Sequence, residues 1–171
     1  METKLCWLVS STRLILKMYS ILMGGDIDLA ADYMRLLAPP PHLALAPLTI
    51  AGEVSFTQIG CASCHMPTLH KGANAIQALD RKAVNLYSDL LLHDMGRLND
   101  GIAQSNATMH EMRTPPLWGL PARDSYLHEG RSSTVDGAIR AYEGEGTFSR
   151  DRYIRMNPQQ RQQLLDFLAI L

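Results

Sequence analysis

The sequence has few cysteines, few aromatic residues and no excess of charge of either sign. Three cysteines in 171 residues are too few for the disulfide framework of a small secreted scaffold. The 16 basic and 17 acidic residues give a formal net charge of -1, which provides no footprint for nucleic acid. Aromatic residues make up 6% of the chain, so another apolar body is expected to help fill the core. With 46% hydrophobic residues, one globular domain, or one domain with an appendage, is expected.

Long hydrophobic runs are also missing near the start of the chain. Arg13 and Lys17 interrupt the apolar residues there, and the uncharged stretches are far shorter than the ~20 residues that a transmembrane helix needs. A basic residue and a short apolar stretch resemble a stunted export signal, but no clear cleavage site follows. We therefore expect no transmembrane segment. Residues 1–25 form a poorly assigned N-terminal segment, expected to be an amphipathic helix with Cys6 as a buried small hydrophobic residue.

Helical patterns and helix-stopping residues organise the rest of the chain. Apolar residues recur at helical spacing until the three prolines at 39–41 end the pattern. Short helices are expected over 51–60 and over 134–142. Asn157 and Pro158 are a favoured pair for starting a helix. An apolar stripe follows them, made of Leu164, Leu165, Leu168 and Leu171.

The segments between these helices read as irregular backbone. Residues 66–110 and 111–131 are loop-rich, and the second of them holds several prolines and glycines. No period-two alternation typical of a strand stands out in the chain. The sequence therefore predicts an all-α domain with long irregular loops over residues 26–171.

One short motif carries chemistry. Cys61 and Cys64 are followed directly by His65 in the pattern Cys-x-x-Cys-His, which is typical of covalent c-type haem attachment. Two thiols at this spacing can add to the two vinyl groups on one edge of a porphyrin. The histidine ring then lies beneath the iron as its proximal ligand. A porphyrin would also supply the large apolar body that the low aromatic content leaves room for.

Two other chemistries use closely spaced cysteines. A thioredoxin-like dithiol is expected within a βαβ surround, and no such pattern is visible. A structural zinc site needs four ligands in a closed array. His65 and His70 could join the two thiolates, but a second cysteine pair is missing from the sequence.

Five sequence blocks then occur in the order of a known family. They are GCASCHMPTL, LYSDLLLHDMGRLNDG, MRTPPLWGL, YLHEGRSSTVDGAIRAYEGEG and a final Leu-rich helix. Together they resemble the C-terminal haem domain of the di-haem cytochrome c peroxidase superfamily. The most similar branch is that of the di-haem oxidoreductases, also called thiol oxidoreductases, and the resemblance covers residues 28–171. The name thiol oxidoreductase finds no support in the residues, because no spare cysteine pair exists beyond the motif.

The resemblance implies a cytochrome-c-like helical fold around one covalent haem c, attached through Cys61 and Cys64, with His65 as the proximal iron ligand. It also implies that the helix before the motif crosses the C-terminal helix. Gly52 and Phe56 are at positions typical of that first helix, and the C-terminal leucine stripe would be their partner.

The same resemblance points to a residue on the far side of the iron. The family's distal residue lies fourteen positions after the histidine of a Tyr-x-His-x-Gly block, here His128, and that position is Tyr142. A phenolate ligand would stabilise ferric iron and lower its potential. Met95 or a water molecule is the alternative distal ligand. His93 and His128 are expected to brace the pocket or its loops.

The chain departs from the family in one respect, because the full enzymes carry two CxxCH motifs and this sequence has one. We expect an electron-transfer domain of a di-haem peroxidase-like oxidoreductase without its N-terminal haem half. Its partner would be a second haem domain or an electron donor or acceptor protein. The alternative is a stand-alone haem peroxidase or oxidase with a Tyr-ligated or open iron. A periplasmic location is expected, because c-type haem is normally attached outside the cytoplasm, although no clear signal peptide is present.

Overall fold

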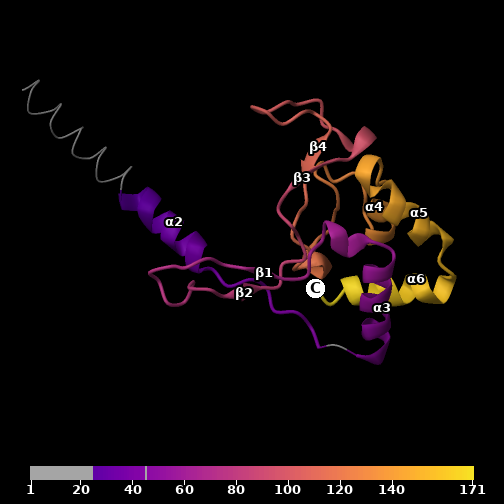
Figure 1. Cartoon of the computed structure of the whole chain (residues 1–171), viewed down its shortest axis with the longest axis horizontal. Coiled ribbons are helices and arrows are strands. Elements are labelled where there is room, and N and C mark those ends of the chain that lie inside the picture. Colours follow the sequence, from indigo (N-terminus) through magenta and orange to yellow (C-terminus); the bar gives the residue numbers. More distant parts are fainter. Residues whose placement is uncertain (1–24, 45) are drawn as a thin grey trace, which may run out of the picture. The chain divides into compact units, whose positions relative to one another are not determined.

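A computed structural model describes residues 25–44 and 46–171 (Figure 1). The expectations for residues 1–24, including Cys6, lie outside the described residues. The chain divides into two compact units, Met1–Pro39 and Pro40–Leu171. In the first unit, α2 (Asp26–Leu36) forms the helix that the apolar spacing predicts, and none of its residues is buried. The second unit contains the CxxCH motif and the core.

Two helices frame the second unit, and each begins at a proline. Helix α3 (Pro47–Gln58) and helix α6 (Pro158–Leu168) both have proline at their first position, where the missing N–H removes no helical hydrogen bond. The Asn157 side chain accepts a hydrogen bond from the Gln160 backbone N–H at 2.8 Å. The Gln160 side chain in turn accepts one from the Asn157 backbone N–H. This reciprocal capping confirms the helix start that the sequence predicts there.

Helices α3 and α6 cross at Gly52. A Cβ atom at this position would lie 2.0 Å from the Gln163 carbonyl oxygen and 2.6 Å from the Phe167 Cβ, so the two backbones touch where glycine has no side chain. Beside the crossing, the rings of Phe56 and Phe167 pack edge to face with centroids 5.6 Å apart. Tyr87 packs against both rings, at 6.0 Å and 5.8 Å. The crossing expected for Gly52 and Phe56 is therefore present, with Phe167 as their main partner.

The prediction of an all-α fold is wrong, because the long loops pair into two small antiparallel sheets. Strand β1 (Leu69–His70) pairs with β2 (Ala83–Val84), and β3 (Leu92–Asp94) pairs with β4 (Glu111–Arg113). Strands of two or three residues are too short to show period-two alternation. Each pair instead closes a long connecting loop, so the described domain mixes helices with short sheets.

The segment between β4 and α6 adds two further helices. Thr134 caps α4 (Val135–Arg140) by accepting a hydrogen bond from the Gly137 N–H at 3.0 Å. Helix α5 (Thr147–Arg155) was not expected from the sequence, and its Tyr153 is fully buried. The Tyr153 hydroxyl donates a 2.6 Å hydrogen bond to Asp136, which ties the two helices together. Among the helices of the described part of the chain, none is long and apolar enough to span a membrane.

Candidate functional site

The CxxCH motif follows α3 through a glycine turn. Gly60 adopts a left-handed backbone with φ of 95°, a conformation that costs glycine little. The short 3-10 turn η2 (Cys61–Ser63) then presents the first cysteine. The His65 backbone N–H donates to the Cys61 carbonyl at 2.9 Å, so the two cysteines and the histidine lie on one continuous turn.

A second segment, residues 86–91, wraps around this turn. The backbone N–H groups of Ser88 and Asp89 donate to the carbonyls of Met66 and Cys64 at 2.9 Å and 2.8 Å. Ser88 is fully buried and its hydroxyl donates to the Thr114 carbonyl. Tyr87 is held at a positive φ of 53°, which non-glycine residues rarely adopt. A backbone conformation of this kind is maintained only where the surrounding structure holds it. At Tyr87 it points the carbonyl oxygen toward His65 of the motif.

That carbonyl sets the protonation of His65. The His65 Nδ1 lies 3.0 Å from the Tyr87 carbonyl oxygen. Because a carbonyl only accepts, Nδ1 carries the proton and the lone pair is left on Nε2. Burial lowers the pKa of His65, although the Tyr87 hydrogen bond opposes this. The ring is therefore held neutral with Nε2 ready to ligate, the arrangement in which metal-binding histidines are oriented by a backbone carbonyl.

Both motif cysteines are free thiols and are partly buried. Burial raises the pKa of Cys61 to about 12, with a further contribution from Cys64. Burial and the nearby Asp89 carboxylate raise the pKa of Cys64 as well. Catalytic dithiols depend on lowered thiol pKa values and electropositive surroundings. The raised pKa values of both thiols therefore argue against dithiol redox chemistry.

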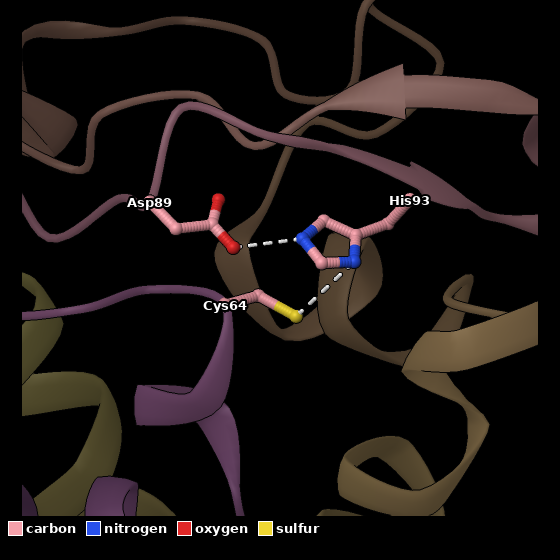
Figure 2. Close-up of side chains that lie close together, drawn as sticks. All are labelled: Cys64, Asp89 and His93. Atoms are coloured by element: carbon pink, nitrogen blue, oxygen red, sulfur yellow. Dashed lines mark hydrogen bonds and ion pairs between the residues drawn. The ribbon is translucent and has the colours of Figure 1, made fainter.

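Cys64 also belongs to a cluster with Asp89 and His93, drawn in Figure 2. Their ligand atoms lie within 4.8 Å of one another. The His93 Nδ1 is 3.7 Å from the Cys64 sulfur, and its Nε2 is 2.8 Å from the Asp89 carboxylate. The hydrogen bonds that His93 donates to the carboxylates of Glu145 and Asp89 raise the pKa of His93. This favours an imidazolium, which has no lone pair for a metal. The cluster is better explained as an ion-pair network than as a zinc site.

The zinc alternative needs His70 as a ligand, and the structure does not place His70 beside the thiols. His70 lies in β1 and is exposed, while the buried His65 is oriented by Tyr87. The residues that the structure brings to Cys64 are Asp89 and His93 instead. Cys64, Asp89 and His93 supply three ligand atoms, one fewer than the closed tetrahedral array of a structural zinc site.

The two distal candidates, Tyr142 and Met95, lie side by side. A Cβ atom at Gly146 would lie 3.1 Å from both the Met95 methyl carbon and the Tyr142 Cβ. Burial raises the pKa of Tyr142 to about 12, with smaller contributions from Cys61 and Cys64. The structure brings both candidates close to each other, although they are 47 positions apart in the sequence.

Three further residues of the matched sequence blocks have contacts that the sequence did not predict. His128 pairs with Glu129 at 2.8 Å and with Asp100 at 3.9 Å, so it braces its own loop. Sequence reasoning missed Asp89, although it precedes His93 by four residues inside a matched block. It also missed Glu145, which contacts His93 across 52 positions, a separation that no local pattern reveals.

Comparison with known proteins places the chain in a family. A family model described as "di-haem oxidoreductase, putative peroxidase" matches residues 31–171. A solved structure of Kuenenia stuttgartiensis hydrazine synthase, pressurised with 20 bar xenon, is similar with a TM-score of 0.51 and 19% identity. The match covers 78% of this chain and 50% of that chain. Because the identity is only 19%, the match shows the fold alone. A search of curated proteins found no match. The chain therefore belongs to the di-haem oxidoreductase family.

Proposed function

We propose that this chain binds one covalent c-type haem through thioethers from Cys61 and Cys64, with His65 as the proximal iron ligand. The observation that carries the proposal is the turn on which the His65 ring, oriented by the Tyr87 carbonyl, follows two free thiols. When bound, such a haem supplies reversible one-electron chemistry at its iron. The residues of the chain bind it, orient the ligating ring and exclude water from it.

We further propose that the domain carries electrons as one half of a di-haem, peroxidase-like oxidoreductase. Two observations support this role over a stand-alone peroxidase. The sequence has one CxxCH motif, whereas the family is described as di-haem. Two potential ligands, Tyr142 and Met95, lie together at Gly146, and a ligated sixth position favours electron transfer over peroxide chemistry. The electron partner is then a second haem domain or a redox protein, and a periplasmic location would suit covalent haem attachment.

Peroxide turnover separates the two functions. We expect the haem-loaded protein to be reduced and reoxidised reversibly without turning over hydrogen peroxide faster than an equal amount of free haem. Tyr142→Phe is the matched variant, because removal of a ligand opens the iron to peroxide, and it should gain turnover. Rapid peroxide turnover by the unaltered protein would favour the enzyme instead.

The Tyr142 assignment has its own spectroscopic test. We expect Tyr142→Phe to change the ferric absorption and EPR spectra and to raise the midpoint potential, because a phenolate stabilises ferric iron. Met95→Leu is the matched control and should leave both unchanged. If the two variants exchange these results, Met95 is the ligand; if Tyr142→Phe has the spectra of the unaltered protein, the assignment is wrong.

A further inference from the structure

We propose that Glu143 and Glu145 are positioning residues, which hold the loop that contains Met95 so that Tyr142, and not Met95, would ligate the iron of a bound haem. The inference rests on the proposed function, because it concerns the sixth ligand of the bound haem. We call the two glutamates and their partners His93, Asp94 and Arg97 the clamp. It joins the segment that contains Tyr142 to the segment that contains Met95.

Glu145 makes the first half of the clamp. One carboxylate oxygen lies 2.9 Å from the His93 Nδ1, and the other accepts a 3.0 Å hydrogen bond from the Asp94 backbone N–H. His93 is in turn fixed by Asp89 at 2.8 Å, and it approaches the Cys64 sulfur (Figure 2). Glu145 therefore ties the distal segment to the residues around the motif.

Glu143 makes the second half. Its carboxylate accepts hydrogen bonds from the backbone N–H of Arg97, at 3.1 Å, and from the Arg97 guanidinium. The Arg97 side chain is exposed, and an exposed ion pair alone stabilises little. The bond to the backbone N–H matters more here, because it fixes the position of the loop that follows Met95.

Glycines let the two segments approach this closely. Gly144 lies between the two glutamates with φ of 51°, and a Cβ atom there would lie 2.2 Å from the Asp94 carbonyl oxygen. Gly96 lies opposite with φ of 61°, and its Cβ would lie 3.0 Å from the Glu143 Cβ. Because both positions are glycine, the backbone at Gly144 packs directly on the backbone of Asp94 and Gly96, which flank Met95.

The two candidate ligands differ in how firmly they are held. Helix α5 fixes the Tyr142 backbone, because the Arg150 guanidinium donates a 2.7 Å hydrogen bond to the Tyr142 carbonyl. Met95 has a long, flexible side chain, and its placement depends on the loop that the glutamates tie down. Release of that loop would let the thioether compete for the iron, and methionine ligation raises the potential.

The experiment compares haem-loaded Glu143→Ala/Glu145→Ala with the unaltered protein by ferric spectra and midpoint potential. We expect a positive shift in potential and a second ligation state in the double variant. Adding Met95→Leu should abolish both. Glu143→Gln/Glu145→Gln should show a smaller shift of the same sign, because the amide oxygens still accept the backbone hydrogen bonds. Glu129→Ala, which removes a paired carboxylate outside the clamp, should change nothing.

Unchanged spectra and potential in both double variants would overturn the inference, as would a shift that persists after Met95→Leu. If the alanine pair fails to fold, the glutamine pair and its Met95→Leu derivative decide by the same readouts. Failure of the proposed function is distinguishable, because the unaltered protein would then hold no covalent haem at all.

Discussion

Replacing Cys61 and Cys64 together with alanine is expected to abolish covalent haem attachment completely. Each thioether forms when one S–H adds across one vinyl group, so a chain without both thiols has nothing to add. The structure favours this reaction by placing both free thiols on the turn that presents His65. The measurement is the mass of the denatured chain after acid extraction, which removes haem that is not covalently bound.

The single variants and one control sharpen this result. Cys61→Ala and Cys64→Ala should each retain haem through one thioether, which leaves one vinyl group unreacted. Cys6→Ala is the matched control, because Cys6 stands outside the motif, and it should retain haem fully. Covalent haem in the double variant would mean that another residue anchors it and that the motif has been misread.

Gly52→Ala is expected to destabilise the domain by about 3 kcal/mol or more, because an added Cβ overpacks the helix crossing. That Cβ would lie 2.0 Å from the Gln163 carbonyl oxygen, a backbone atom that cannot rotate away. The helices would have to separate, and the packing of Phe56 on Phe167 would loosen with them. For a domain of this size, the melting temperature should fall by roughly 10 °C.

Thermal unfolding followed by circular dichroism measures this effect. Gly72→Ala is the control, since no atom lies within 4 Å of its Cβ position and alanine favours backbone order. It should change the free energy of unfolding by no more than about 0.5 kcal/mol. Equal stability of the Gly52 and Gly72 variants would show that α3 and α6 do not cross as described.

Local patterns predicted α2, α3, α4 and α6, but neither α5 nor the sheets. The capped start at Asn157 and the crossing at Gly52 are visible in the sequence or through the family resemblance. The leucine stripe gave only part of the crossing, because Phe167, which is fully buried, was not counted in it. Strands β1 to β4 could not be predicted, because two or three residues leave no periodic pattern in the sequence. Their pairing depends on the closure of long loops.

The candidate site shows the same division. The motif identifies Cys61, Cys64 and His65 because their spacing is local. The carbonyl that orients His65 belongs to the backbone of Tyr87. Every residue has such a group, so the residue type does not predict this role. Glu145 acts across more than fifty positions. Such contacts depend on the tertiary fold, and the sequence shows only that the residues are present.

The pyridine haemochrome spectrum of the protein, expressed with export and haem-attachment machinery, tests the central claim most directly. Its α-band position reports how many vinyl groups have been converted to thioethers, and the haem content is read against the protein concentration. We predict one haem per chain, retained after acid extraction, with the α band of a haem bound by two thioethers. A spectrum of unmodified haem that is lost on extraction, or no haem at all, would contradict the proposed covalent c-type site.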